Sequence, residues 1–325
     1  MTKDLTNFCG VFVLSKKHFN RLLKCDIIYL WGYGGIGRRA GFRFQWATVQ
    51  VRPLLSPPNF NKGEKLMLLQ QFDNTKRAMI NPDLFHKPLA NMQKTCVTFF
   101  SKSVMKAVVE NYHAELITEE IKNSTAVFPV YKVNINGTEI AVFQSAVGAP
   151  ACVSNAEELI ALGVKNIIAV GSCGCLQNDI EEYSIIIPTA AIRDEGTSYH
   201  YAPVSDETVL DEEVVSVLEG VLKQHGINYK KGKTWTTDAI FRETPQKVQD
   251  RIARGAITVD MECSAYDILC KFRGVKYGQL FYAADNLANE EYDPRNIMNS
   301  NSNQDAKQKV AALAFECAVE IDKRF

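Results

Sequence analysis

The chain has 325 residues, of which 46% are hydrophobic and 23% are charged, and its formal net charge at pH 7 is zero. This composition predicts a soluble globular protein without membrane contact, since no run approaches the ~18 consecutive apolar residues that a membrane-spanning helix needs. The length suits one large domain with an appendage, because single hydrophobic cores stop growing at about 250–300 residues.

The nine cysteines are an odd number, and most lie in apolar runs without the paired spacing of metal ligands. We therefore expect reduced thiols, a cytoplasmic protein and no bound metal ion. Charge is distributed unevenly, because residues 1–60 contain nine Lys or Arg and two Asp or Glu, which leaves the rest of the chain with a net charge of −7. The main body has no recognisable basic module, so we expect no nucleic acid ligand.

Residues 27–37 match the fingerprint of a dinucleotide site in form only. The strand-like run Ile27–Trp31 precedes Gly32–Gly37, which has the G-x-G-x-x-G spacing. A genuine fingerprint is followed about 20 residues later by an acid that binds the ribose, whereas the next acid here is Glu64. We expect no nucleotide cofactor at this motif.

Residues 35–53 resemble instead the peptide obtained when a transfer RNA gene is translated conceptually. Amphipathic order begins only after Met67, so we expect residues 1–66 to be a basic, disordered extension and hypothesise that the natural start is Met67. The alternatives are a flexible basic arm or a targeting peptide. Secretion is disfavoured, because an apolar segment followed by a cleavage site is lacking.

After Met67, strand-like and helix-like segments alternate, which is typical of an α/β domain. Asn136-Gly137 predicts a two-residue hairpin turn between two of the strands. The final helix has apolar residues at helical spacing and is expected to pack on the sheet. We expect strands at about 95–100, 127–136, 139–145, 166–170, 183–189, 231–237, 256–259 and 277–284, and helices at about 103–112, 150–162, 207–225, 245–254, 262–272 and 303–323.

Polar residues gather where three of the predicted strands end, and open α/β sheets bind ligands at such ends. Gly171-Ser172-Cys173-Gly174 places two glycines and a hydroxyl at the first end, so that backbone N–H groups can approach an anion or a sugar closely. A simple tight turn is the alternative interpretation.

The second strand end carries Asp260-Met261-Glu262, with two carboxylates two positions apart where a strand meets a helix. A carboxylate there can accept hydrogen bonds from both hydroxyls of a ribose. Capping of the following helix by the same carboxylates explains the pattern equally well.

The third strand end places Asp285 after the apolar run Leu280–Ala284, at the rim of the predicted sheet. A purine leaves a nucleoside more easily when its N7 is protonated as the C–N bond breaks, so a carboxylic acid near the base is the group required. An Asx turn or a helix cap is the alternative.

Four motifs occur in the order and spacing typical of one enzyme family: Gly171–Gly174, Thr236–Ala239, Val259–Glu262 and Ala284–Asp285. Together they resemble the purine nucleoside and uridine phosphorylase superfamily over nearly all of residues 90–325. The Val-Asp-Met-Glu motif is the most specific of the four.

The resemblance implies an α/β fold over residues 67–325, a single three-layer domain with a mixed, partly barrel-like central sheet flanked by helices. It also implies a homo-oligomer, a dimer or a trimer of dimers, whose sites borrow residues from a neighbouring subunit. His86 is a candidate for such a borrowed residue, although a lone histidine is more often structural.

The same resemblance implies roles for individual residues. Glu262 would hold the ribose hydroxyls with help from Asp260, which replaces the usual Glu, while Met261 packs on the sugar. Asp285 would protonate the base. Phosphate, the co-substrate, would lie at Ser172 and Gly171, and the base would lie near Cys173, Gly174, Ile240 and Phe241.

This chain departs from the family pattern in its phosphate site. Family members hold phosphate with a Gly-Asp-Pro loop and several arginines, whereas the corresponding regions here contain residues 100–105 and Ala169, without arginine. Lys102 is the substitute we favour, with Lys106 and Lys122 also available. We therefore predict a nucleoside phosphorylase without a cofactor, with a hydrolytic nucleosidase or a non-catalytic nucleoside-binding protein as alternatives.

Overall fold

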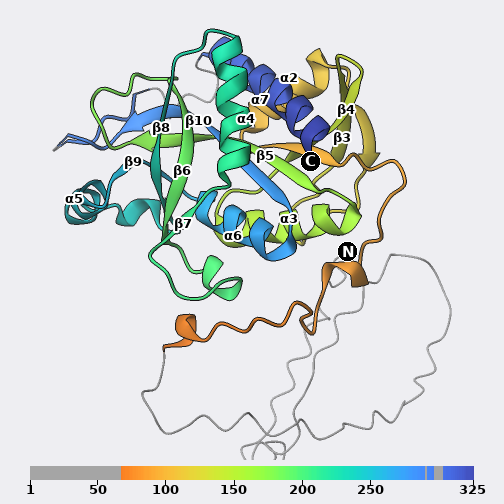
Figure 1. The fold of residues 1–325 in the computed structure, drawn as a ribbon, viewed down its shortest axis with the longest axis horizontal. Helices are drawn as coiled ribbons and strands as arrows, with labels where there is room; N and C mark the ends of the chain where they lie inside the picture. Colours follow the sequence, from red (N-terminus) through yellow and green to blue (C-terminus); the bar gives the residue numbers. More distant parts are fainter. Residues whose placement is uncertain (1–66, 290, 296–302) are drawn as a thin grey trace, which may run out of the picture. The chain divides into compact units, whose positions relative to one another are not determined.

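The computed structural model of the protein describes residues 67–289, 291–295 and 303–325, which belong to the unit Lys62–Phe325 (Figure 1). The expectations for residues 1–66, including the basic extension and the dinucleotide-like motif, lie outside the described residues. No helix in the described ranges is long and apolar enough to cross a bilayer.

A single sheet of ten strands forms the centre of the described domain, and five of these strands close into a ring. The strand order is β10-β6-β8-β9-β5-β1-β4-β3-β2, with β7 paired to β6 and β10 also paired to β5. Strands β5, β10, β6, β8 and β9 therefore form a closed, barrel-like ring, from which the other strands extend. The strands are β1 Thr95–Phe99, β2 Glu115–Thr118, β3 Val130–Ile135, β4 Thr138–Gln144, β5 Asn166–Cys175, β6 Ile185–Asp194, β7 Glu207–Val209, β8 Tyr229–Thr237, β9 Ala256–Asp260 and β10 Lys276–Asn286.

The sheet is mixed in direction. Strand β5 runs parallel to β1 and β10 but antiparallel to β9, and β10 runs antiparallel to β6. The predicted hairpin joins β3 and β4, and its turn residues Asn136 and Gly137 have φ angles of 50° and 90°, as the two-residue turn requires. The prediction of a mixed, partly barrel-like sheet is confirmed.

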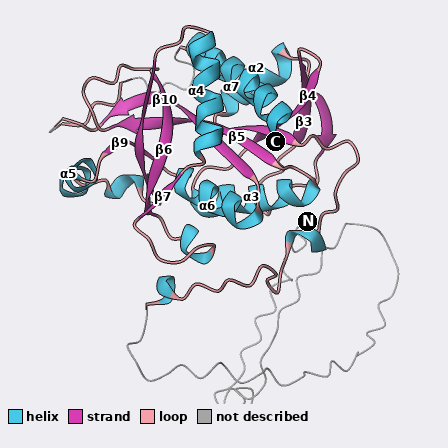
Figure 2. Ribbon diagram, in the orientation of Figure 1, coloured by secondary structure: helices cyan, strands magenta, loops and turns pink. Residues whose placement is uncertain are grey.

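Helices cover both faces of the sheet, which gives the predicted three layers (Figure 2). Helices α2, α4 and α7 pack together on one face, and α3 and α6 pack together on the other, while α5 lies against β9. The helices are α2 Lys102–Asn111, α3 Ala149–Leu162, α4 Glu212–Gln224, α5 Pro245–Ala253, α6 Cys263–Arg273 and α7 Gln304–Arg324, with single 3₁₀ turns η1 Leu68–Gln70, η2 Pro82–Leu84, η3 Ser198–His200 and η4 Ile240–Arg242.

The helix predicted over 207–225 is wrong in its first turn. Residues 207–209 form strand β7 on the edge of β6, where the Thr208 hydroxyl donates to Asp267 at 2.5 Å. Helix α4 begins only after Asp211, whose carboxylate accepts from the backbone N–H of Glu213 at 3.0 Å. The short strand β2 escaped prediction because its four residues are exposed or half-buried and lack an apolar alternation.

The strands that carry the motifs are longer than predicted. Strand β5 continues beyond Val170 to Cys175, because residues 171–173 pair with residues 281–283 of β10. Gly171-Ser172-Cys173-Gly174 is therefore part of the barrel wall rather than a turn. Asp285 likewise lies inside β10, where the sequence had placed it beyond the strand.

Helix α7 contributes an aromatic anchor to the core. Phe315 is 1% exposed and lies edge-on to Phe99 of β1, with ring centroids 6.0 Å apart. Its ring also contacts Tyr112 at the end of α2, at 4.9 Å. This side chain thus joins one helical layer to the sheet.

We expect Phe315→Ala to lower the free energy of unfolding by about 3–5 kcal/mol, since it removes a buried aromatic ring and leaves a cavity. Chemical denaturation measures the loss. Lys309→Ala on the exposed side of the same helix is the control and should change stability by less than about 0.5 kcal/mol. Equal effects of the two changes would contradict the packing role of Phe315.

Candidate active site

Three barrel strands and the loops that follow them enclose a cavity of about 130 Å³. Most of the residues predicted from the sequence meet there, although they are up to 113 positions apart in the chain. The lining includes Ser172, Cys173 and Gly174 of β5, Asp260, Met261 and Glu262 at the end of β9, Ile240 of η4 and Asp285 of β10. Phe100, Val147, Glu243 and Val259 complete it.

Three predicted residues lie outside the cavity lining. Gly171 faces Phe100, and a Cβ there would lie 2.9 Å from the Phe100 ring, so this glycine makes room for an aromatic wall. Lys102 is exposed at the first position of α2. Phe241 is 95% exposed, because the single turn of η4 directs Ile240 rather than Phe241 into the cavity.

An irregularity in β10 accompanies the placement of Asp285. The register of β10 against β5 shifts between Ala283 and Asn286, and Asp285 lies within this interval. A bulge of this kind leaves a residue out of the regular ladder and changes the direction of its side chain. Asp285 is 7% exposed and reaches the cavity from within the barrel wall.

Asp260 is saturated by hydrogen bonds from the protein. Its Oδ1 accepts from the hydroxyls of Thr234 at 3.0 Å and Thr236 at 2.9 Å, both on β8. Its Oδ2 accepts from the backbone N–H groups of Glu262 at 2.8 Å and Cys263 at 2.6 Å, where α6 begins. A carboxylate offers about four acceptor positions, and these donors give Asp260 a capping role, while its contact with a ribose stays a prediction.

Glu262 keeps acceptor capacity toward the cavity. The backbone N–H of Gly148 donates to its Oε1 at 2.6 Å. Burial of the side chain, together with the nearby charge of Asp260, raises the pKa of Glu262 to about 8. At this pKa the group holds a proton at neutral pH, and a ligand with several hydroxyl donors would favour its ionised form.

Asp285 and Glu243 form a second acidic pair. Burial raises the pKa of Asp285, while a hydrogen bond donated by the Tyr292 hydroxyl at 3.0 Å opposes that rise. Burial and then the charge of Asp285 raise the pKa of Glu243 to about 7. Glu243 can thus exchange a proton near neutral pH, and burial favours the protonated form of Asp285.

The charged side chains that line the cavity are all acidic: Glu243, Asp260, Glu262 and Asp285. Within the described part of the chain, no Lys or Arg side chain contributes to the lining. The site can therefore donate protons and accept hydrogen bonds from hydroxyls, but its lining offers an anion no cationic partner.

A family model described as the phosphorylase superfamily matches residues 94–321. The matched region contains every residue that lines the cavity. The chain belongs to the phosphorylase superfamily. A guanosine phosphorylase of Halorubrum lacusprofundi is 26% identical over 160 residues, which cover 49% of this chain and 66% of the relative. The uridine phosphorylase of Haemophilus influenzae is 24% identical over 249 residues, which cover 72% and 97%.

Among solved structures, the AMP nucleosidase of Bacteroides thetaiotaomicron superimposes with a TM-score of 0.58 at 19% identity, covering 72% of this chain and 90% of that chain. At this identity the likeness concerns the fold alone. The described domain has the fold of this superfamily, and the two curated relatives differ in the nucleoside that their names give.

Two polar residues of this superfamily member were missed from the sequence. Glu243 follows Ile240 closely but belongs to none of the four motifs. Tyr292 lies seven positions after Asp285 but outside the four motifs, and its hydroxyl reaches that carboxylate because the segment after β10 folds back. A search for further acids after the Thr-Thr-Asp motif could have found Glu243.

His86 has a partner within its own chain. Its Nε2 lies 2.8 Å from Glu158 Oε2 on α3, and its Nδ1 lies 3.6 Å from Glu120 Oε2. The ring is buried and does not line this chain's cavity. A contribution of His86 to the site of a neighbouring subunit stays a prediction. The observed contacts hold residues 82–86 against α3.

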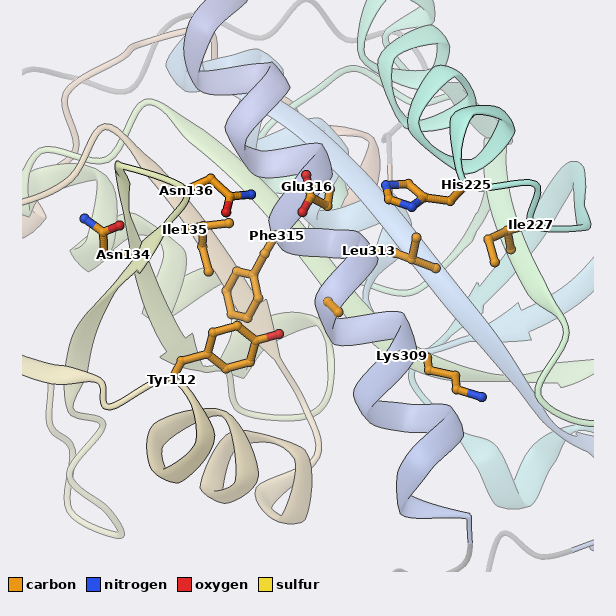
Figure 3. A pocket seen from close by; sticks show the side chains of 11 residues that line it. Tyr112, Asn134, Ile135, Asn136, His225, Ile227, Lys309, Leu313, Phe315 and Glu316 are labelled. Carbon is orange, nitrogen blue, oxygen red and sulfur yellow. The ribbon is translucent and has the colours of Figure 1, made fainter.

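A larger cavity, of about 450 Å³, lies beside α7 (Figure 3). Its lining comes from the ends of α2 and α4, the β3–β4 turn and α7, and includes Tyr112, Asn136, His225, Phe315 and Glu316. None of the motif residues of the superfamily reaches it. Volume alone would therefore select this larger cavity as the active site. We assign the site to the acidic cavity instead, because of the chemistry of its side chains.

Asp260→Ala should lower the free energy of unfolding by about 2–4 kcal/mol, because it leaves two buried backbone N–H groups at the start of α6 without an acceptor. Asp260→Asn is the matched control, since its amide oxygen can still accept from those N–H groups, and should cost clearly less. Urea denaturation compares the two. If alanine and asparagine proved equally mild, the capping role would be wrong.

Proposed function

We propose that the chain cleaves the N-glycosidic bond of a nucleoside and transfers the ribosyl group to inorganic phosphate, giving free base and ribose 1-phosphate. The observation that carries this proposal is the pair of buried carboxyl groups, Glu262 and Asp285, which line one cavity from different strands and both have raised pKa values. Glu262 suits the hydroxyls of the sugar, and Asp285 suits the leaving base.

Glu262 is proposed to bind the ribose. The Gly148 N–H fixes one of its oxygens, which leaves the carboxylate oriented to accept hydrogen bonds from the two sugar hydroxyls. Met261 beside it supplies an apolar surface for the ring. Asp260 supports this arrangement from behind by holding the start of α6, as its hydrogen bonds indicate.

Asp285 is proposed as the general acid. As the C–N bond lengthens, positive charge develops on the ribosyl group and negative charge develops on the base. A protonated Asp285 would donate its proton to the base, while the ionised Glu262 stabilises the oxocarbenium-like sugar. The direction of the pKa shift of Asp285 supports this role, because burial favours the protonated form that a general acid needs.

Phosphate is proposed to bind at the rim, at the hydroxyl of Ser172, which is exposed within the lining of the cavity. Lys102, exposed at the start of α2 just beyond Phe100, remains the proposed cationic partner. The relatives named guanosine and uridine phosphorylase support phosphate as the acceptor.

Hydrolysis is the second candidate, and the acidic lining favours it. Ionised carboxylates repel a phosphate dianion, whereas water enters without such a penalty. The fold shared with an AMP nucleosidase is consistent with water as the acceptor.

Glu243 is proposed to read the base. A carboxylate can accept two adjacent N–H donors, such as the N1–H and 2-amino group of guanine. Uracil instead presents one N–H between two carbonyl oxygens, which a carboxylate repels. We therefore propose a purine nucleoside, guanosine above uridine, as the substrate.

A homo-oligomer, either a dimer or a trimer of dimers, is proposed to complete the site. Val147 lines the cavity and is 60% exposed, and Phe241, the neighbour of Ile240 in the chain, is 95% exposed. Exposed apolar side chains at the mouth of a site favour a covering partner.

We expect the domain to release base from guanosine in the presence of phosphate and Asp285→Asn to reduce turnover at least about 100-fold, since general acid catalysis contributes roughly 10²–10⁴-fold. A panel of purine and pyrimidine nucleosides, with and without phosphate, measures this. Asp179→Asn, at an exposed carboxylate paired with Lys230, is the control and should leave turnover unchanged.

Cleavage without phosphate would replace phosphorolysis by hydrolysis. Binding of nucleosides without any cleavage would contradict an enzyme and indicate a nucleoside-binding protein.

Glu243→Gln should lower kcat/KM for guanosine by about 10-fold to 100-fold, the equivalent of about 1.5–3 kcal/mol for hydrogen bonds to a charged group, while uridine gains relative to guanosine. In the unaltered protein, Glu243 loses its proton as the pH rises through about 7, so kcat/KM for guanosine should rise across that range. Rates at pH 6 to 8 test this, and equal losses for both nucleosides would refute base reading by Glu243.

A further inference from the structure

The two carboxyl oxygens of Asp285 have different surroundings. Oδ2 accepts a hydrogen bond from the Tyr292 hydroxyl at 3.0 Å. Oδ1 lies on the side of Gly174, since a Cβ built on that glycine would be 3.2 Å from it. Gly174 lines the cavity, so Oδ1 is the oxygen directed toward the place where a base would lie.

Tyr292 belongs to a short segment that folds back against the barrel. The backbones of Asn286 and Asp293 exchange two hydrogen bonds, at 2.9 and 3.0 Å. The Arg295 guanidinium donates to the carbonyl oxygen of Ile180 at 2.9 Å and to Cys175 Sγ at 3.5 Å. This segment is therefore anchored on both sides of Tyr292, although the tyrosine itself is 57% exposed.

We propose that Tyr292 is a positioning residue, which directs the proton of Asp285 onto Oδ1 by donating its own hydroxyl hydrogen to Oδ2. The inference rests on the proposed role of Asp285 as general acid. A protonated carboxyl group has one O–H, and an oxygen that already accepts from a phenol is the less suitable place for it. The proton then faces the cavity rather than the loop.

The proton balance of the step is simple. The Oδ1–H bond breaks as the new N–H bond of the base forms, and the electron pair of the glycosidic bond remains with the base. Phosphate oxygen forms the new bond to the anomeric carbon. Asp285 is left as a carboxylate, to which the Tyr292 hydroxyl donates more strongly than to the neutral acid.

Several titratable or charged groups face Asp285 from the elements around it. Glu243 approaches from the residues before α5, Asp293 and Arg295 from the returning segment, and Cys173 and Cys175 from β5. Glu262 shares the cavity. Burial raises the pKa of Asp285, and the hydrogen bond from Tyr292 opposes this rise most strongly, followed by a backbone hydrogen bond and the charge of Arg295.

Tyr292→Phe tests the inference, because it removes the hydroxyl and keeps the ring. We expect kcat for guanosine to fall about 5-fold to 50-fold while KM changes less than about 2-fold, since the bond to the developing carboxylate is lost. The pKa of Asp285 should rise, because the lost hydrogen bond favours its ionised form. An acid acts only while protonated, so the alkaline limb of the kcat profile should move to higher pH.

Tyr229→Phe is the matched control. It also removes a tyrosine hydroxyl that donates to a carboxylate, Glu219 at 2.5 Å, but at the far end of β8. Its kcat and pH profile should equal those of the unaltered protein. A fall of kcat in Tyr292→Phe without movement of the pH profile would assign Tyr292 a purely structural role and overturn the proposal.

Infrared titration of the Asp285 carboxyl gives a readout that needs no turnover, with Asp285→Ala identifying the band. If the unaltered protein cleaves no nucleoside, the proposed function fails, while this titration still reports whether Tyr292 lowers the pKa of Asp285. An identical Asp285 pKa in the unaltered protein and Tyr292→Phe would overturn the positioning role whether or not the protein is an enzyme.

Discussion

The double pairing of β10 is the constraint on which the site depends. Because this strand bonds to β5 along one edge and to β6 along the other, the sheet closes into a ring instead of remaining open. Closure brings the ends of β5, β9 and β10 around one small volume, although their residues are far apart in the chain. The acidic cavity is a direct result of this geometry.

The same closure explains the departure of the strands from their expected lengths. Gly171–Gly174 reads in the sequence as a turn, because glycines and a serine after an apolar run usually end a strand. Here the pairing with β10 continues past Val170, and the glycines give space to neighbouring side chains. Long-range pairing of this kind leaves no periodic signal in a single sequence, so the fold class was predictable while these strand ends were not.

The sequence predicted the residues of the cavity that are part of a compact motif and missed those whose position depends on the course of a loop. Glu262 and Asp285 lie in short, specific patterns, and the structure places both in one cavity. Asp260 belongs to the same pattern, yet only the observed donors distinguish a cap from a ligand. Tyr292 is brought to Asp285 by two backbone hydrogen bonds between Asn286 and Asp293, which no pattern in the sequence predicts.

Gly174 shows how a residue without a side chain can control chemistry. A methyl group there would lie 2.7 Å from Leu287, 2.8 Å from Val259 and 3.2 Å from Asp285 Oδ1. Every larger residue would need the space beside the acid, so natural variation at this position has almost no room. Any side chain at position 174 would have to displace Leu287 or Val259 and would crowd the oxygen of Asp285 that the proposed mechanism uses.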